Sequence, residues 1–239
     1  MEKILLIETS TALCSVALCS NGEVLAYKES SEPRAHASLT AVFVDEILKE
    51  CNIDLKDCCA VCVSEGPGSY TGLRVGVSTA KGLCFGAKLP LLSVGTLDLL
   101  AAQAIMKGLL PEGCKYIVPM IDARRMEVYT AVFNAEGQRV TLTDEDHNLG
   151  ETKAKIIDNN SFAKILDNGP VLFIGDGAGK CEGTICHPNA HFIQCYPEAR
   201  AMAKAAHVEY TEKRFKDVAY FEPFYLKDFV ATVSKKKFF

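Results

Sequence analysis

The sequence predicts an α/β fold of two lobes, each built around a central β-sheet. Strand-like and helix-like patterns alternate in both halves of the chain, as in layered α/β proteins. The pattern that opens the chain returns after residue 114, so a duplicated architecture is expected. The 239 residues are 49% apolar, which is enough for one large domain or for two lobes with hydrophobic cores.

Short-range periodicity predicts the elements of the first half. Three strands come first, at 3–8, 13–19 and 23–28, and the Asn-Gly pair before the third is a hairpin signal. A helix is expected over 37–51, because apolar residues recur there at helical spacing. The elements expected after it are a strand at 59–64, a glycine-rich turn, a helix at 71–85, a strand near Leu91 and a helix at 96–106.

The second half begins as the first does. The segments "KYIVPMID", "MEVYTAVF" and "NAEGQRV" match the opening "KILLIE", "LCSVALC" and "SNGEVLAY", which aligns Ile7 with Ile121 and Glu8 with Asp122. The match is short, so coincidence is the alternative interpretation. Duplication predicts an N-terminal lobe at 1–108 and a C-terminal lobe at 109–239.

The remainder of the second half has weaker patterns. The polar stretch 144–155 is expected to be a loop. A helix at 162–166, strands at 171–174 and 192–195, and a helix at 198–213 are expected to follow. We expect an ordered apolar tail near 220–231, and fraying over 234–239.

Composition excludes some classes of function. With 26 Lys and Arg against 30 Asp and Glu, the chain has no broad basic footprint, so strong binding of nucleic acid by this chain alone is not expected. Most of the 11 cysteines lie in apolar, strand-like runs, which is typical of reduced thiols in the cytoplasm. Neither a signal peptide nor a membrane span is recognisable, so a soluble cytoplasmic protein without a membrane partner is expected.

The segment "SEGPGSYTGLRVGVSTAKGL" is the strongest local signal. Gly66 and Gly68 permit a tight turn, and Thr71 is the expected N-cap of the helix that follows. Such a turn can direct backbone N–H groups at an anion, although the glycines can equally serve only the turn and close packing. It is no Walker A loop, because Leu73 stands where that motif has Lys.

Small residues recur along the same helix. Gly72, Gly76 and Ala80 form one ridge at i, i+4 and i+8, and a second ridge at the same spacing consists of Ser78, Gly82 and Gly86. A glycine inside a helix costs up to about 1 kcal/mol relative to alanine, so several of them indicate close approach of another helix. The sequence leaves open whether that helix is intramolecular or belongs to a partner.

The segments "ILLIETST", "GPGSYTGLRVGVSTAKGL", "DARRMEVY" and "EPFYLKD" together resemble the TsaB family, in matching order and spacing. The resemblance implies a duplicated actin-like, hexokinase-like fold of the ASKHA and RNase H-like type. It also implies a role in threonylcarbamoyladenosine synthesis on tRNA. Members of this glycoprotease-like family form heterodimers with a catalytic paralogue, TsaD, and an ATPase, TsaE, joins them. We therefore expect the chain to contact tRNA only within the complex, and to form a homodimer when it is alone.

The resemblance also implies what this chain lacks. In the catalytic relative an HxxxH pair on the next helix binds a metal ion, and the matching positions here are Thr96 and Leu100. Neither side chain ligates iron or zinc in that way. No metal, cofactor or catalytic residue is therefore expected. His187 and His191 have a similar spacing, and a structural zinc site with nearby cysteines is the weaker alternative.

Two helices are expected to form the docking surface for TsaD, because they do so in the family. The expected contact residues are His36, Leu39, Phe43, Ile47, Thr71, Gly72, Val75, Gly76, Thr79 and Ala80.

Glu8 and Asp122 each end the first strand of their half, so they are candidates for a vestigial nucleotide or anion site together with Gly66 and Gly68. Active enzymes of this fold favour Asp followed by Gly where this chain has Glu8 and Thr9. An actin-like small-molecule kinase or ATPase using Glu8 and Asp122 is therefore the alternative function, and plain strand-end carboxylates are the structural one.

Two further functions have little support. Peptidase activity is not expected, because Ser69 lies in a turn with no base and orienting acid at readable spacing. Three terminal lysines, Lys235 to Lys237, indicate a solvated tail rather than an RNA-reading surface, because no aromatic stacking platform accompanies them.

Overall fold

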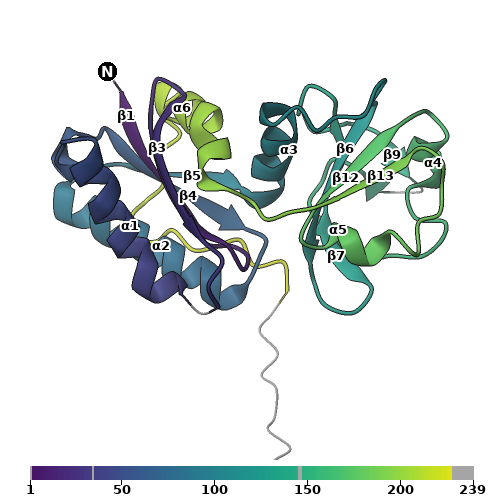
Figure 1. Cartoon of the computed structure of the whole chain (residues 1–239), viewed down its shortest axis with the longest axis horizontal. Helices are drawn as coiled ribbons and strands as arrows, with labels where there is room; N and C mark the ends of the chain where they lie inside the picture. Colours follow the sequence, from purple (N-terminus) through teal and green to yellow (C-terminus); the bar gives the residue numbers. More distant parts are fainter. Residues whose placement is uncertain (1, 34, 145–146, 228–239) are drawn as a thin grey trace, which may run out of the picture.

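The computed structural model describes residues 2–33, 35–144 and 147–227, which form two lobes side by side (Figure 1). The first sheet has the order β3-β2-β1-β4-β5 and the second the order β11-β7-β6-β12-β13, with β8 also pairing with β6. The strands are β1 (Lys3–Glu8), β2 (Cys14–Ser20), β3 (Glu23–Ser30), β4 (Ala60–Gly66), β5 (Leu91–Gly95), β6 (Tyr116–Asp122), β7 (Glu127–Thr130), β8 (Phe133–Asn134), β9 (Thr143–Asp144), β10 (His147–Asn148), β11 (Lys153–Ile156), β12 (Val171–Gly175) and β13 (Ala190–Gln194). The helices are α1 (His36–Glu50), η1 (Leu55–Asp57), α2 (Tyr70–Ala87), α3 (Thr96–Met106), α4 (Ala163–Leu166), α5 (Ala178–Cys181), η2 (Ala199–Met202) and α6 (Ala203–Thr211).

The two sheets repeat one topology. In the N-terminal lobe β1 pairs antiparallel with β2 and parallel with β4, and β4 pairs parallel with β5. In the C-terminal lobe β6 pairs antiparallel with β7 and parallel with β12, and β12 pairs parallel with β13. The duplicated α/β fold of the actin-like, hexokinase-like type is thus confirmed, and the match of β1 with β6 is not a coincidence.

The third strand of the second lobe differs from the prediction. The segment "NAEGQRV" forms a tight turn, in which Gly137 N donates to Asn134 O at 3.0 Å. The outer strand is instead β11, which pairs antiparallel with β7. The expected loop at 144–155 therefore ends in a strand, and its polar sequence concealed this because β11 is an edge strand with no fully buried residue.

Each face of the first sheet is covered by a different part of the chain. Leu5 and Ile7 on one face pack with α1 and α2, whereas Ile4 and Leu6 on the other pack with η2 and α6 (Figure 1). This alternation follows from the two-residue repeat of a strand. The return of η2 and α6 to the first sheet means that the division into 1–108 and 109–239 does not describe the lobes: the end of the chain completes the N-terminal core.

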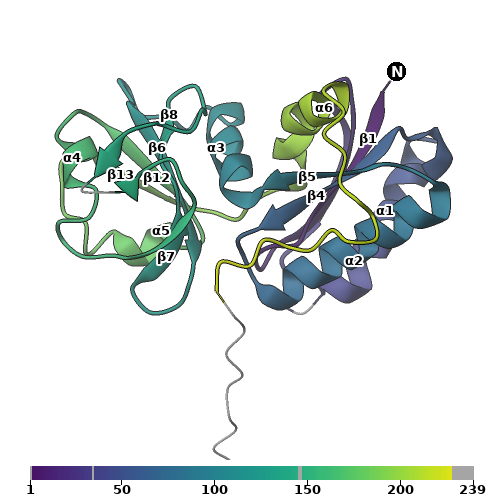
Figure 2. The same ribbon diagram turned by 180° about the vertical axis from the view of Figure 1, so that it is seen from behind.

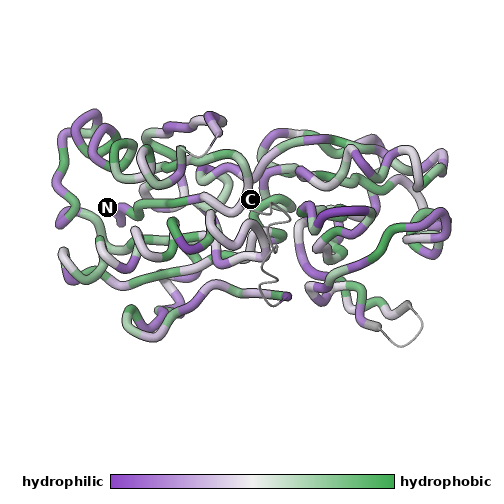
Figure 3. Tube along the Cα trace, turned by 90° about the horizontal axis from the view of Figure 1, so that it is seen from below, coloured by the Kyte–Doolittle hydropathy of each residue, from purple (hydrophilic) through white to green (hydrophobic). Residues whose placement is uncertain are grey.

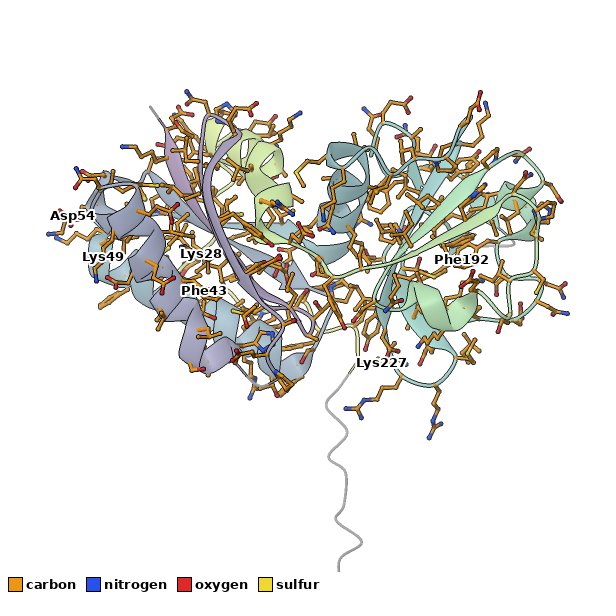
Figure 4. All side chains as sticks on the ribbon, in the orientation of Figure 1. Lys28, Phe43, Lys49, Asp54, Phe192 and Lys227 are labelled. Atoms are coloured by element: carbon orange, nitrogen blue, oxygen red, sulfur yellow. The ribbon has the colours of Figure 1, made fainter. Side chains whose placement is uncertain are left out.

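After α6 the chain runs alongside α2 (Figure 2). Lys216 N donates to Leu91 O at 2.8 Å, and Phe224 N donates to Glu65 O at 2.7 Å. Lys81 on α2 donates to the carbonyls of Ala219 and Phe221 at 3.1 and 3.0 Å. Lys227, the last described residue of this segment, pairs with Glu127 of the other lobe at the lobe junction (Figure 4). The rest of the expected tail lies outside the described residues, as do Lys235 to Lys237.

Hydrophilic and hydrophobic stretches alternate along both lobes, and neither lobe is predominantly hydrophilic (Figure 3). All eleven cysteines are unpaired thiols. Within the described chain, no helix combines the length and the apolar character that crossing a bilayer requires.

Candidate functional site: the outer helix face and the lobe junction

The glycine-rich turn before α2 packs against the loop that follows β1. A Cβ atom on Gly68 would lie 2.4 Å from the carbonyl oxygen of Ser10, so only glycine fits there. Ser69 N donates to the same carbonyl at 2.6 Å. Ser69 also provides the N-cap, because its hydroxyl accepts from Gly72 N at 3.3 Å, and Thr71 is therefore not the cap.

This packing bears on the predicted anion site. The amide groups of Ser69 and Gly72 are used within the chain. Gly66 is covered by the segment that runs beside α2, since an added Cβ would lie 2.8 Å from Phe224 O. The glycines at 66 and 68 thus serve close packing, which was the plainer of the two interpretations.

The first small-residue ridge of α2 lies inside the chain. Gly72 and Gly76 pack on the loop after β1: an added Cβ would lie 2.1 Å from Thr9 O and 2.3 Å from Thr9 Oγ1, respectively. Ala80 is fully buried in the same lobe, as is Ile47 on α1. These four predicted interface residues are therefore wrong as surface contacts, because the ridge packs on the loop after β1 and on this chain's own sheet, and Ile47 lies in the core between α1 and that sheet.

The second ridge faces outward. Added Cβ atoms on Gly82 and Gly86 would meet nothing within 4 Å, and Ser78 is exposed. Phe85, between these glycines, is 84% exposed. Nothing in the described residues explains why this helix has two glycines with open space around them, or why an exposed phenyl ring lies between them.

The other predicted contact residues lie on or beside this outer face. Thr71 is exposed, and Val75 and Thr79 are half-buried on α2 at positions that share the face of Gly82. Leu39 and Phe43 are half-buried on the neighbouring helix α1 (Figure 4). His36 begins α1 with its Nε2 2.8 Å from Thr11 O, so it ties the helix to the loop after β1.

At the lobe junction, Glu8 is fully buried at the end of β1. Its Oε1 accepts from Ser10 N at 2.5 Å, whereas Oε2 has no partner among the described residues. Burial raises the pKa of the Glu8 carboxyl to about 7. A carboxyl without solvent exposure cannot touch a magnesium-bound nucleotide in this arrangement.

The environment of Asp122 differs from that of Glu8. Its side chain is 45% exposed and forms an ion pair with Lys180. The acidic group that acts electrostatically on Glu8 is Asp176, which follows β12. Burial raises the pKa of Asp176 to about 6, and its Oδ1 accepts from Asp122 N at 2.9 Å.

Sequence reasoning missed three residues of these sites. Asp176 and Lys180 lie in "GDGAGK", a polar turn. This turn follows β12, which corresponds to β4 in the duplicated fold, and its position was a usable signal. Phe85 lies among the glycines of the second ridge. An aromatic residue between Gly82 and Gly86 on a helix was the signal for an exposed anchor.

The two positions that the resemblance sets against an HxxxH pair lie in the protein interior. Thr96 and Leu100 are both fully buried. Among residues 2–33, 35–144 and 147–227, no three His, Cys, Asp or Glu side chains gather as metal ligands would. The fold and these sites together define a duplicated actin-like protein with a buried carboxyl at its lobe junction and an exposed, glycine-bearing helix face.

Comparison with known proteins specifies the family. The model for TsaD, tRNA N6-adenosine threonylcarbamoyltransferase, matches residues 24–235. The tRNA threonylcarbamoyladenosine biosynthesis protein TsaB of Escherichia coli strain K12 is 32% identical over 235 residues, 96% of each chain. The tRNA N6-adenosine threonylcarbamoyltransferase of Halalkalibacterium halodurans is 36% identical over 109 residues, 39% of this chain and 32% of that protein.

A solved structure agrees with this assignment. An uncharacterised Pseudomonas aeruginosa protein, described as similar to the peptidase YeaZ, superposes with a TM-score of 0.80 at 26% identity, covering 95% of this chain and 100% of that one. The chain therefore belongs to the TsaB family, whose curated members are tRNA threonylcarbamoyladenosine biosynthesis proteins.

Proposed function

We propose that this chain is the non-catalytic subunit of a complex that makes threonylcarbamoyladenosine on tRNA, and that it binds a TsaD-type catalytic partner through the outer face of α1 and α2. The observation that carries the proposal is the exposed ridge of Ser78, Gly82 and Gly86 beside Phe85. Bare helix backbone lets a second helix approach closely, and an exposed aromatic residue is a typical interface anchor.

Neighbouring residues extend this face toward the area that a heterodimer needs. Val42 on α1 is 44% exposed, and Thr71, Val75 and Thr79 extend the face along α2. A stable heterodimer of standard size buries roughly 1,600 Å² in total, and two helices on each side can supply that area. In this proposal the chain holds the TsaD-type subunit in a productive shape, and chemistry takes place on the partner.

The remaining partners follow from the family. A TsaE-type ATPase joins the pair, and tRNA binds to the assembled complex. When the partner is absent, two copies of this chain pair through the same face. A cytoplasmic location is part of this proposal, and the unpaired cysteines of the chain support it. Burial of Glu8 and the ion pair of Asp122 support this subunit role over the kinase or ATPase alternative.

Substitution of Gly82 tests the proposal. Gly82→Leu places a branched side chain on the bare ridge, where the fold has room for it, so the chain should remain folded while capture of its own TsaD-type partner falls by at least about tenfold. Capture of the purified partner by tagged chain measures the effect. Gly183→Leu is the matched control, since its added side chain also meets open space, but in the C-terminal lobe. Undiminished capture by Gly82→Leu would rule out this face as the docking surface.

A further inference from the structure

The loop between β6 and β7 has a backbone conformation that its residues rarely adopt. Arg124 and Arg125 have φ angles of 68° and 49°, in the left-handed region. They are the only two consecutive non-glycine residues with positive φ in the part of the chain that the structure describes. Lys88 and Lys213, also with positive φ, come just after helices, where a left-handed residue is a usual ending.

Left-handed geometry at two arginines is strained. Asn and Gly adopt this region readily, and a hairpin loop normally uses them, whereas a long side chain raises the free energy of the folded state. Strained residues in natural proteins cluster at functional sites, where the side chain is needed for another purpose. A pair of arginines at these two positions therefore indicates a use for both guanidinium groups.

Hydrogen bonds hold the loop in this shape. Arg124 N donates to Asp122 Oδ1 at 2.8 Å, and Glu127 N donates to Arg124 O at 3.2 Å. Ala123 N donates to Glu127 O at 3.1 Å and closes the loop. The backbone under the two arginines is thus fixed before any ligand binds, which lowers the entropic cost of binding.

The charges of the two arginines are not compensated locally. Both side chains are exposed, and neither guanidinium forms an ion pair or hydrogen bond within residues 2–33, 35–144 and 147–227. Two acidic residues at the ends of the loop already have cationic partners, since Asp122 pairs with Lys180 and Glu127 pairs with Lys227. Among the described residues, the loop therefore carries two positive charges without a partner, on a chain whose net charge is −4.

We propose that Arg124 and Arg125 bind the phosphate backbone of RNA. This rests on the proposed function, since relatives of the chain act in tRNA modification. Arginine presents a planar fork of donors that matches phosphate oxygens. The loop is an exposed turn rather than a concave pocket, which suits the backbone of a large polyanion better than a small ligand. The loop belongs to the C-terminal lobe, whereas α1 and α2 belong to the N-terminal lobe (Figure 1), so we expect RNA and the TsaD-type subunit to bind together.

The test uses a fluorescently labelled, unmodified tRNA transcript and the double variant Arg124→Asn/Arg125→Gly. Anisotropy is measured with the isolated chain at low salt, and with the chain bound to its TsaD-type partner over a range of salt. Affinity for the transcript should fall by about tenfold, and the dependence of log K on log salt should become shallower by about one to two. The melting temperature should rise, because Asn and Gly relieve the strain.

The matched control removes the same charge elsewhere. Lys213→Gly/Arg214→Asn also takes away two cations and one left-handed lysine, but Arg214 is already paired with Glu209 at 2.6 Å. This control should bind the transcript like the wild-type chain. Equal affinity of the wild-type chain and the Arg124/Arg125 variant, or an equal loss in the control, would overturn the proposal.

Two further measurements keep the outcomes distinct. ATP is titrated into both proteins: if the wild-type chain binds ATP through this loop while RNA affinity is unchanged by the double variant, the loop is a nucleotide site and the RNA proposal is wrong. Capture of the TsaD-type partner should be unaffected by the double variant. Should the wild-type chain fail to capture that partner, only the docking proposal fails, and the titration of the isolated chain still decides the RNA proposal.

Discussion

At the scale of single residues, Glu8 couples folding to pH. Burial raises the pKa of its carboxyl from 4.5 to about 7 in the folded chain, so the folded state holds this proton more tightly than the unfolded state does. The contribution of Glu8 to stability is therefore fully present below about pH 4.5 and is lost as pH rises through about 7.

Replacing Glu8 with glutamine should remove this dependence. The amide side chain of Glu8→Gln keeps a carbonyl oxygen for Ser10 N but carries no charge to bury. We expect the variant to gain about 2 to 3 kcal/mol over the wild-type chain between about pH 5 and pH 8, measured as the difference between their urea unfolding free energies. Asp176, whose pKa is also raised, is present in both proteins, so the difference reports the charge of Glu8 together with its interaction with Asp176. Parallel stability curves for the two proteins would show that Glu8 stays ionised throughout.

At the scale of elements, α2 has two glycine ridges with opposite roles. Gly72 fits against Thr9 O, whereas Gly82 has open space around it. Gly72→Ala should therefore destabilise the chain by several kcal/mol, because a backbone atom must move to admit the new methyl group. Gly82→Ala should stabilise it by about 0.5 to 1 kcal/mol through helix propensity. Thermal unfolding of the two variants provides the comparison, and the same sign of change in both would contradict the assignment of the ridges.

Much of this arrangement could be predicted from the sequence, and the limits have physical causes. The strands of the first sheet and α1 to α3 were predictable to within about two residues, because their apolar periodicity is strong, whereas β9, β10 and β11 were not predicted. The spacing of Gly72, Gly76 and Ala80 shows that something lies close to the helix, but a sheet of the same chain and a partner's helix demand the same small residues. Glu8 was recognisable as a strand-end carboxylate, but its neighbour Asp176 comes from a distant segment in the other half of the chain, and no local pattern encodes that proximity.

At the scale of the whole molecule, the lobes share structural elements. Helix α3 contributes Leu99 to the core of the N-terminal lobe and Leu97 and Leu100 to the core of the C-terminal lobe. The N-terminal core also depends on Met202, which is fully buried although it comes late in the chain. We therefore expect the two lobes to unfold together, because neither core is complete without a segment that the other lobe holds in place.

Met202→Ala tests this coupling. The substitution opens a cavity in the N-terminal core and should cost about 2 to 5 kcal/mol. The chain contains no tryptophan, so Phe192→Trp gives a single reporter in the C-terminal lobe (Figure 4). If the lobes are coupled, the urea midpoint of this reporter falls when Met202→Ala is added, although the two residues belong to different lobes. A reporter whose midpoint stays unchanged while circular dichroism shows an earlier transition would mean that the lobes unfold independently.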